Sequence, residues 1–469
     1  MRAAALGLAL LCGAALAQGA PPAGGATGAG TKLQVPYEKY TLDNGMEVIL
    51  HVDERLPVVA VNVWYHVGAY QEPKGRSGFA HLFEHMMFQG SAHVGDDQHI
   101  AMLERLGATD LNGTTNFFRT NYFQTVPQNY LETALWLESD RMGFLLPALT
   151  EEKLKTQQEV VKNERRQRIE TAPYGVAQER LWQAMFPQPH PYFGRVIGSM
   201  ADLDAATVGD VSDFFDTWYA PSNATLTLAG AFDPKEAKAL VQKYFGTLPR
   251  RPEPKEPDVK PARLEKELVL EHDERIATLP AITIAWHTPE AFAEGDAAAD
   301  VLSAVLSDGK GSRLHRRLVR EKRIAQSVSA FQWSIKGQSV FMVDATAAPG
   351  HTAEELQREI DLVLAEVREG GVTPEEVRRA RNKIETDFVA GLQSVGGMSG
   401  KADRMQMYNH VWKEPDGFAR DLARYEAVTP QMVQAFAKEF LGDRRAVLRA
   451  TPAQSAQSEQ QPAQKKEGN

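Results

Sequence analysis

The sequence has almost no cysteine. Its single cysteine among 469 residues is Cys12, which lies in the apolar run from Ala3 to Ala17. The segment Ala15-Leu16-Ala17 predicts a signal peptide that is removed before Gln18, and the thiol would leave with it. Disulfides, cysteine metal ligands and a cysteine nucleophile are then excluded. Acylation of Cys12 is the alternative, but Leu11 before it is atypical of a lipid-attachment site.

An excess of positive charge is also absent, because 52 lysines and arginines face 61 acidic residues for a formal net charge of -9. Nucleic-acid-binding proteins commonly have a basic face, so this class is disfavoured. The N-terminal apolar run is shorter than the roughly 20 residues of a membrane span, and no other segment reaches that length. We therefore expect a soluble protein that is exported to the periplasm or secreted.

A stretch rich in proline and charge, Pro249 to Pro261, divides the chain near its middle. Its prolines exclude a sheet interior or a regular helix, so it is a predicted linker. The predicted organisation is a signal peptide at 1–17, a flexible lead-in at 18–33, an N-terminal half at 34–248, the linker at 249–261, a C-terminal half at 262–450 and a disordered tail at 451–469.

The two halves resemble each other at a nearly constant offset. Thr429 follows Thr207 by 222 positions, and each residue begins a helical pattern. Thr373 follows Thr150 by 223 positions and begins a similar acidic helical pattern. Strand patterns occur at 58–67 and 281–287, and further helical patterns at 151–170, 355–368 and 374–392. These similarities indicate an internal duplication, and the predicted fold class is an α+β protein made of two α/β sandwich halves.

The segment His81-Leu82-Phe83-Glu84-His85 has the spacing of a metal site. On a helix, His81 and His85 lie one turn apart on the same face, where both can bind one Zn²⁺ at about 2.0–2.1 Å. Glu84 lies near enough to contact a water on the metal without binding the metal. The pattern H-x-x-E-H is the inverted form of the H-E-x-x-H zinc-protease motif. Taken alone, it also fits a pair of histidines with no metal.

A catalytic zinc has three protein ligands and an open position. His93 and His99 lie in a polar stretch, and we expect both to be solvated rather than bound to metal. Glu159 and Glu164 lie in a helical segment, and their spacing of five directs them to different faces. At most one of them can be the third ligand.

Several motifs together resemble the pitrilysin/insulinase family of zinc metallopeptidases. They are similar to its bacterial two-domain subgroup, which is related to mitochondrial processing peptidase. The resemblance covers nearly the whole mature chain and rests on 75–91, which include the H-x-x-E-H segment, and on 112–115, 120–122, 159–164, 197–199 and 219–221. It implies a Zn²⁺ held by His81, His85 and Glu164, with Glu84 as the general base. The expected activity is the hydrolysis of peptide bonds in extended peptides or unfolded segments.

The expected substrate site is an exposed sheet edge that contains Asn112 and Thr114, with Arg320 from the second half. The chain has Gln157 and Gln326 where the family pattern has a supporting glutamate and a substrate-contacting tyrosine. A heterodimer with a paralogue that lacks the zinc motif would supply the missing group, and a homodimer is the second possibility. The alternative function is a non-catalytic assembly or binding subunit of the same fold.

Overall fold

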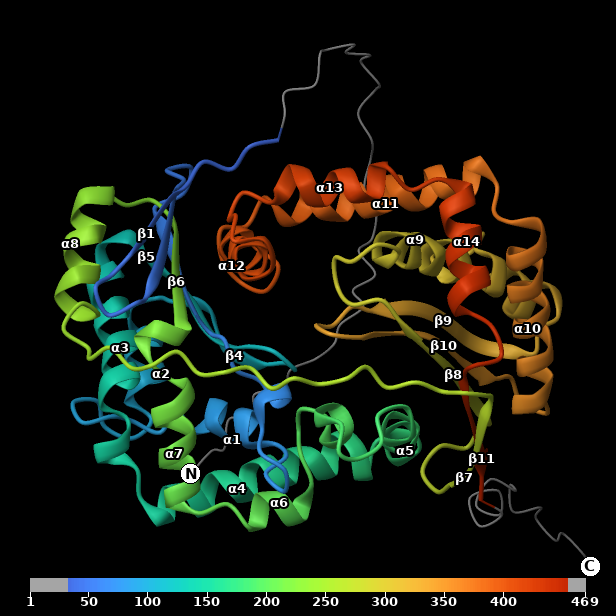
Figure 1. Cartoon of the computed structure of the whole chain (residues 1–469), viewed down its shortest axis with the longest axis horizontal. Coiled ribbons are helices and arrows are strands. Elements are labelled where there is room, and N and C mark those ends of the chain that lie inside the picture. The colour runs from blue at the N-terminus through green and yellow to red at the C-terminus, as the bar shows by residue number, and fades with distance from the viewer. Residues whose placement is uncertain (1–32, 454–469) are drawn as a thin grey trace, which may run out of the picture. The chain divides into compact units, whose positions relative to one another are not determined.

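The computed structural model describes residues 33–453, and residues 34–453 belong to one structural unit with two halves (Figure 1). The predicted signal peptide and nearly all of the predicted lead-in lie outside the described residues. Within 33–453, no helix has the length and hydropathy needed to cross a membrane.

The first half of the unit contains six strands and eight α-helices within the described residues. Its strands are β1 (Glu38–Thr41), β2 (Glu47–Val52), β3 (Val58–Tyr65), β4 (Thr109–Thr115), β5 (Thr120–Pro127) and β6 (Ala224–Gly230). Its helices are α1 (Phe79–Met86), α2 (Gln98–Arg105), α3 (Leu131–Phe144), α4 (Glu151–Arg165), the π-helix η4 (Arg166–Glu170), α5 (Gly175–Met185), α6 (Met200–Asp204), α7 (Val208–Trp218) and α8 (Pro234–Tyr244).

The second half follows a stretch without helix or strand that includes the predicted linker. Its strands are β7 (Leu268–Glu274), β8 (Ala281–Thr288), β9 (Ala325–Trp333), β10 (Ser339–Ala347) and β11 (Ala446–Pro452). Its helices are α9 (Asp296–Ser307), the π-helix η7 (His315–Glu321), α10 (Ala353–Gly370), α11 (Pro374–Gly391), α12 (Lys401–Trp412), α13 (Phe418–Glu426) and α14 (Pro430–Phe440). Strand β11 includes the first two residues of the predicted tail, and the tail beyond residue 453 lies outside the described part.

The two sheets repeat one topology. The first has the order β1-β2-β6-β3-β5-β4, and the second has the order β7-β11-β8-β10-β9. In each sheet one neighbouring pair is parallel, β2 with β6 and β7 with β11, and the other neighbours are antiparallel. Apart from the extra strand β1, the second sheet repeats the first strand for strand. The predicted fold class of two duplicated α+β halves is confirmed.

Alternation along the strands builds a separate apolar core in each half. In β3 the buried side chains of Val59, Val61 and Val63 belong to the first core, which also includes residues of α1 and α3. In β8 the side chains of Ile282 and Ile284 belong to the second core, together with residues of α9 and α10. Period-two alternation places these side chains on one face of each sheet, where helices cover them.

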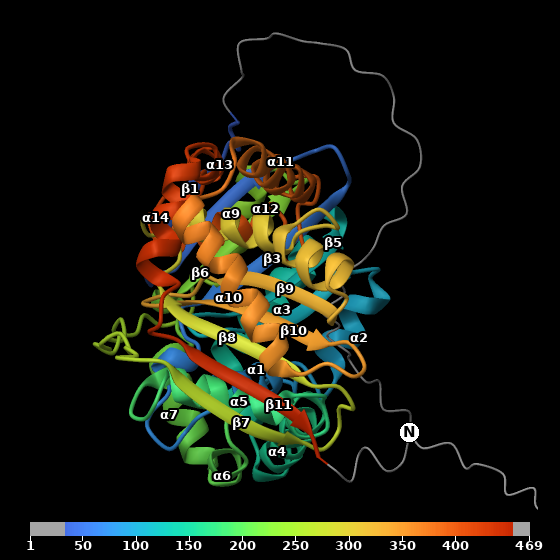
Figure 2. The ribbon, with the colours of Figure 1, turned by 90° about the vertical axis from the view of Figure 1, so that its right-hand side faces the viewer.

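The other face of each sheet is covered by a helix from the opposite half. Helix α5 packs on β7, β8 and β11, and α12 packs on β3 and β6. Figure 2 shows α10 on the near side of the second sheet and α5 behind it. Gln406 of α12 donates from its side-chain amide to the backbone oxygens of Asn62 (3.0 Å) and Thr225 (2.8 Å). The duplicated halves therefore exchange equivalent helices.

Threonines begin the predicted helices. Thr207 and Thr373 make capping boxes with Asp210 and Glu376, and Thr429 caps α14. Such caps satisfy backbone N–H groups that have no partner in the first helical turn. The helix predicted at 151–170 changes from α to π geometry at residue 166, next to the candidate site.

Candidate metal centre

Helix α1 carries the H-x-x-E-H segment, and its first turn is anchored by a carboxylate. It begins after Gly78, whose φ of 89° is a left-handed conformation that glycine adopts without strain. Glu72 accepts hydrogen bonds from the backbone N–H groups of Gly78 (3.0 Å) and Ala80 (2.9 Å). Burial raises the pKa of Glu72 well above its ordinary value, and the two backbone hydrogen bonds act against this rise. Glu72 therefore fixes the end of α1 that bears the first histidine.

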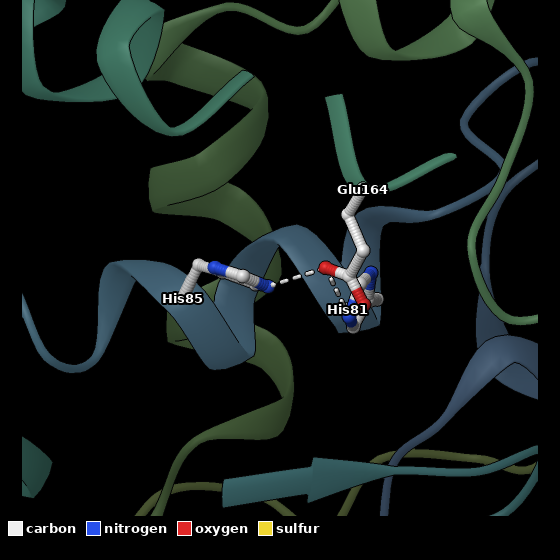
Figure 3. Close-up of side chains that lie close together, drawn as sticks. All are labelled: His81, His85 and Glu164. Carbon is white, nitrogen blue, oxygen red and sulfur yellow. Dashed lines mark ion pairs between the residues drawn. The ribbon is translucent and has the colours of Figure 1, made fainter. Parts of the chain in front are cut away.

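His81, His85 and Glu164 converge on one point (Figure 3). Oxygen Oε2 of Glu164 lies 3.3 Å from Nε2 of His85 and 3.6 Å from Nε2 of His81. The two imidazole rings are perpendicular, with centroids 4.8 Å apart. Helix α1 supplies both nitrogens, and the last turn of α4 supplies the oxygen, so the group forms only where these helices pack together.

The geometry of this group fits a zinc ion. Zinc bonds of about 2.0–2.1 Å at tetrahedral angles place ligand atoms about 3.4 Å apart. The separations of 3.3 and 3.6 Å match this spacing. Two imidazoles and one carboxylate are also a ligand set found in catalytic zinc sites, where a fourth position stays open.

Arg168 supports the carboxylate from the π-helix η4. Its Nη1 lies 2.7 Å from Oε1 of Glu164, one helical turn away in sequence. The two oxygens of Glu164 are therefore divided, since Oε1 faces Arg168 and Oε2 faces the histidines. By contrast, Glu159 pairs with Lys162 at 2.5 Å and has a 59% exposed side chain. Glu164, and not Glu159, lies with the histidines.

The protonation states suit a metal ligand set. Burial lowers the pKa of His81 to about 3, with a further contribution from His85, so this imidazole is neutral. Burial alone would raise the pKa of Glu164, but the hydrogen bond from His85 and the nearby charges outweigh it and lower the pKa to about 2. A neutral imidazole and an ionised carboxylate are the forms that bind metal.

Glu84 lies on α1 beside this group, and burial raises its pKa. Its Oε2 accepts a 2.6 Å hydrogen bond from the hydroxyl of Thr115 on β4. Its other oxygen, Oε1, makes no hydrogen bond within residues 33–453. One carboxylate oxygen is thus held while the other is available to a water or a substrate.

The three residues predicted to bind substrate lie apart from the metal group. Asn112 and Thr114 lie on β4, at the edge of the first sheet, as the substrate prediction requires. The side chain of Thr114 is buried and bonds Asn121 at 2.6 Å, on the strand face opposite Thr115. Arg320 is exposed on η7 in the second half and makes no contact with the metal group in the described chain. The side chains of Asn112, Thr114 and Arg320 do not join the metal group, so their substrate contacts stay predictions.

His99 and Gln157 are polar residues whose side chains are buried. His99 is 2% exposed and packs edge-on against Phe88, so the expectation that it is solvated is wrong. His93 bonds Asp140 at 2.5 Å. Gln157 is buried on α4, two turns before Glu164 on the same face. The apolar neighbours of the α2 sequence were the available signal for the burial of His99.

Sequence profiles of two related domains match the chain. The one described as "Insulinase (Peptidase family M16)" matches residues 47–191, which include the whole metal group. The one described as "Peptidase M16 inactive domain" matches residues 205–384, in agreement with the absence of a metal motif from the second half.

Whole-chain comparisons point the same way. The zinc protease PqqE of Helicobacter pylori is 30% identical over 375 residues, which cover 78% of this chain and 82% of that protein. The uncharacterised zinc protease YmxG of Bacillus subtilis is 22% identical and covers 89% and 98% of the two chains. The crystal structure of a protease from Helicobacter pylori matches with a TM-score of 0.81 and 26% identity over 90% of this chain and all of that one. The chain therefore belongs to the insulinase family, peptidase family M16, as the sequence motifs indicated.

Proposed function

We propose that the chain is a zinc metalloendopeptidase that hydrolyses peptide bonds in extended peptides or unfolded segments. The convergence of His81, His85 and Glu164 beside the carboxylate of Glu84 carries this proposal. The names of the zinc-protease relatives support it, because those proteins match most of this chain.

His81, His85 and Glu164 would hold the metal. A zinc ion in such a site lowers the pKa of water to near 7 and polarises a carbonyl group. Glu84 then acts as the general base, since its Oε1 has no partner in the described chain and can take the proton of the attacking water. The same carboxylic acid afterwards gives that proton to the leaving amine, so one residue serves both steps.

The substrate would bind as an added strand. Strand β4 is the last strand of the first sheet, so one side of its backbone has no neighbouring strand in the described chain. An extended peptide can pair with such an edge through main-chain hydrogen bonds. This mode favours extended segments and depends little on side-chain identity, so a broad sequence preference is expected.

The test compares Glu84→Gln with the wild-type protein. The variant should keep one zinc per chain, because Glu84 is not a ligand, and should lose at least about 100-fold in peptide cleavage. Glu159→Gln is the matched control, since this exposed glutamate on α4 lies away from the histidines and should leave both quantities unchanged. A chelator should abolish cleavage and added Zn²⁺ should restore it. Equal cleavage by Glu84→Gln and wild type would refute the role of the base.

Assembly and location belong to the same proposal. Gln326, in place of the tyrosine of the family pattern, supports a heterodimer with a paralogue that lacks the zinc motif, and a homodimer is the second possibility. The apolar N-terminal run supports export to the periplasm or secretion. Full activity of a homogeneous sample without a second chain would overturn the heterodimer. Bound zinc with no peptidase activity, even with the partner present, would favour a non-catalytic assembly subunit.

A further inference from the structure

One face of β4 lies directly against the candidate base. A Cβ added at Gly113 would lie 3.0 Å from Cγ of Glu84 and 3.0 Å from the ring of Phe88, so the strand approaches α1 as closely as a glycine allows. Thr115, two residues further, faces the same way because side chains alternate along a strand. Thr114 between them faces the opposite side of the sheet and bonds Asn121.

The hydroxyl of Thr115 has three acceptors within reach but only one hydrogen to donate. Oε2 of Glu84 lies at 2.6 Å, whereas the backbone oxygen of Ala80 and the hydroxyl of Thr120 lie at 3.5 and 3.4 Å. The contact with Glu84 is the shortest of the three, whereas the other two lie at the long limit of hydrogen-bond distances. The hydrogen therefore goes to Glu84.

The hairpin holds the backbone that carries Thr115. The side-chain oxygen of Asn116 accepts the backbone N–H groups of Phe118 and Arg119, both at 2.9 Å, which fixes the turn between β4 and β5. The buried guanidinium of Arg119 donates to the backbone oxygen of Thr114 at 2.9 Å. Thr115 thus projects from a restrained segment, and its hydroxyl can hold Glu84 in one place.

We propose that Thr115 is a positioning residue for Glu84. Its hydroxyl holds Oε2 of that carboxylate and leaves Oε1 directed to the attacking water and the leaving amine. The inference rests on the proposed peptidase function. It also gives β4 two roles, because the strand that would pair with the peptide carries the group that orients the base.

The test removes the hydroxyl and then restores it. Thr115→Val keeps the shape of the side chain without the donor, and Thr115→Ser keeps the donor. Misplacing a catalytic group by about 1 Å can cost up to about 100-fold in rate, so we expect kcat of Thr115→Val to fall by about 10-fold. The KM and the zinc content should stay within about twofold of wild type. Thr115→Ser should regain kcat to within about threefold of wild type.

Thr217→Val is the matched control, because this exposed threonine of α7 bonds only the backbone of its own helix. It should leave kcat unchanged. Wild-type kcat in Thr115→Val would overturn the inference. So would loss of zinc in that variant, or an equal fall of kcat in the valine and serine variants, since either would show a structural role. In each case strong loss of cleavage by Glu84→Gln would leave the proposed function standing, whereas unchanged cleavage by Glu84→Gln would refute the base itself.

Discussion

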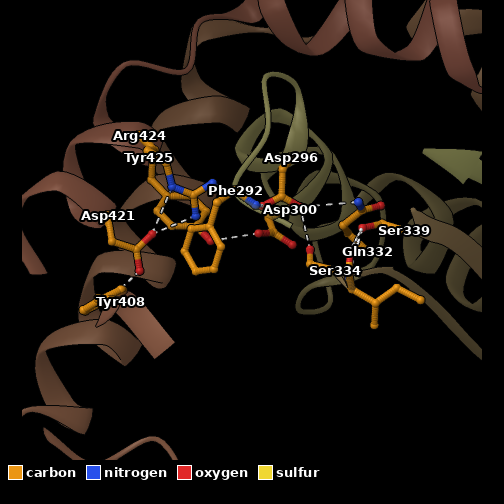
Figure 4. A network of polar contacts seen from close by, with 11 residues as sticks. Phe292, Asp296, Asp300, Gln332, Ser334, Ser339, Tyr408, Asp421, Arg424 and Tyr425 are labelled. Carbon is orange, nitrogen blue, oxygen red and sulfur yellow. Dashed lines mark hydrogen bonds and ion pairs between the residues drawn. The ribbon is translucent and has the colours of Figure 1, made fainter. Parts of the chain in front are cut away.

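Replacement of Asp300 by asparagine should change how stability depends on pH. Asp300 belongs to a polar network in the second half, in which Arg424 is a cation placed among three carboxylates (Figure 4). Arg424 donates to Asp296 at 3.1 Å and to Asp421 at 2.7 Å. Asp300 accepts only the hydroxyl of Tyr425, at 2.8 Å, and has no cation of its own in the described chain. Burial, and then the charge of Asp296, raise the pKa of Asp300 to about 7.

Proton linkage gives the direction in which the free energy of unfolding changes with pH. Between pH 4 and 7 the folded protein keeps the proton on Asp300, whereas the unfolded chain, with an ordinary pKa of about 3.9, has lost it. Stability therefore falls as the pH rises through this window. A shift of about three pKa units, at about 1.36 kcal/mol each, corresponds to about 4 kcal/mol in full, and about 3 kcal/mol of it lies between pH 4.5 and 7.

The asparagine side chain cannot titrate but keeps an oxygen for Tyr425, so Asp300→Asn should remove this contribution. We expect the free energy of unfolding of the variant, relative to wild type, to rise by about 3 kcal/mol between pH 4.5 and 7. Urea unfolding followed by tryptophan fluorescence at several pH values measures it, and the exposed Asp443→Asn is the control. Parallel pH curves for Asp300→Asn and wild type would show that Asp300 does not keep a proton in the folded protein across this pH range.

Two further substitutions test the packing of the site and of the network. Gly113→Ala should lower cleavage by about 10-fold with zinc retained, because its Cβ would press on Glu84 at 3.0 Å, whereas Gly209→Ala, whose Cβ meets its nearest neighbour at 3.7 Å, should be neutral. Equal cleavage by both variants would contradict the close approach of β4. Arg424→Met should lower the free energy of unfolding by about 3 kcal/mol in urea titrations, since it leaves Asp296 buried without its cation. A loss below about 1 kcal/mol would show that the other donors to Asp296 suffice.

Some residues of the site could be recognised only in part from sequence. Arg168 follows Glu164 by four positions, so helical spacing could have indicated the ion pair that the structure contains. Thr115 lay within the predicted edge strand, but its contact with Glu84 depends on how closely β4 approaches α1. Glu72 lies six residues before Gly78, the residue that precedes α1, and no local pattern predicts that its side chain binds the start of this helix.

The features that depend on local spacing could be predicted from the sequence alone. The four-residue interval between His81 and His85 places both on one helix face, and threonine caps and alternating apolar residues mark where helices and strands begin. The 222-residue offset indicated the duplication, because each copy must repeat its own pattern of buried positions. The family motifs added Glu164, since spacing alone left Glu159 open.

The other features of the site and the fold arise from contacts between segments that lie far apart in the chain. The distances from Glu164 to the histidines exist because α4 packs against α1, and this contact joins residues about 80 positions apart in the chain. The exchange of α5 and α12 between the halves could not be predicted from local patterns either, since the sequence of a helix does not specify which sheet it contacts. A sequence pattern specifies which face of an element is buried, but the packing of the whole chain selects the partner for that face.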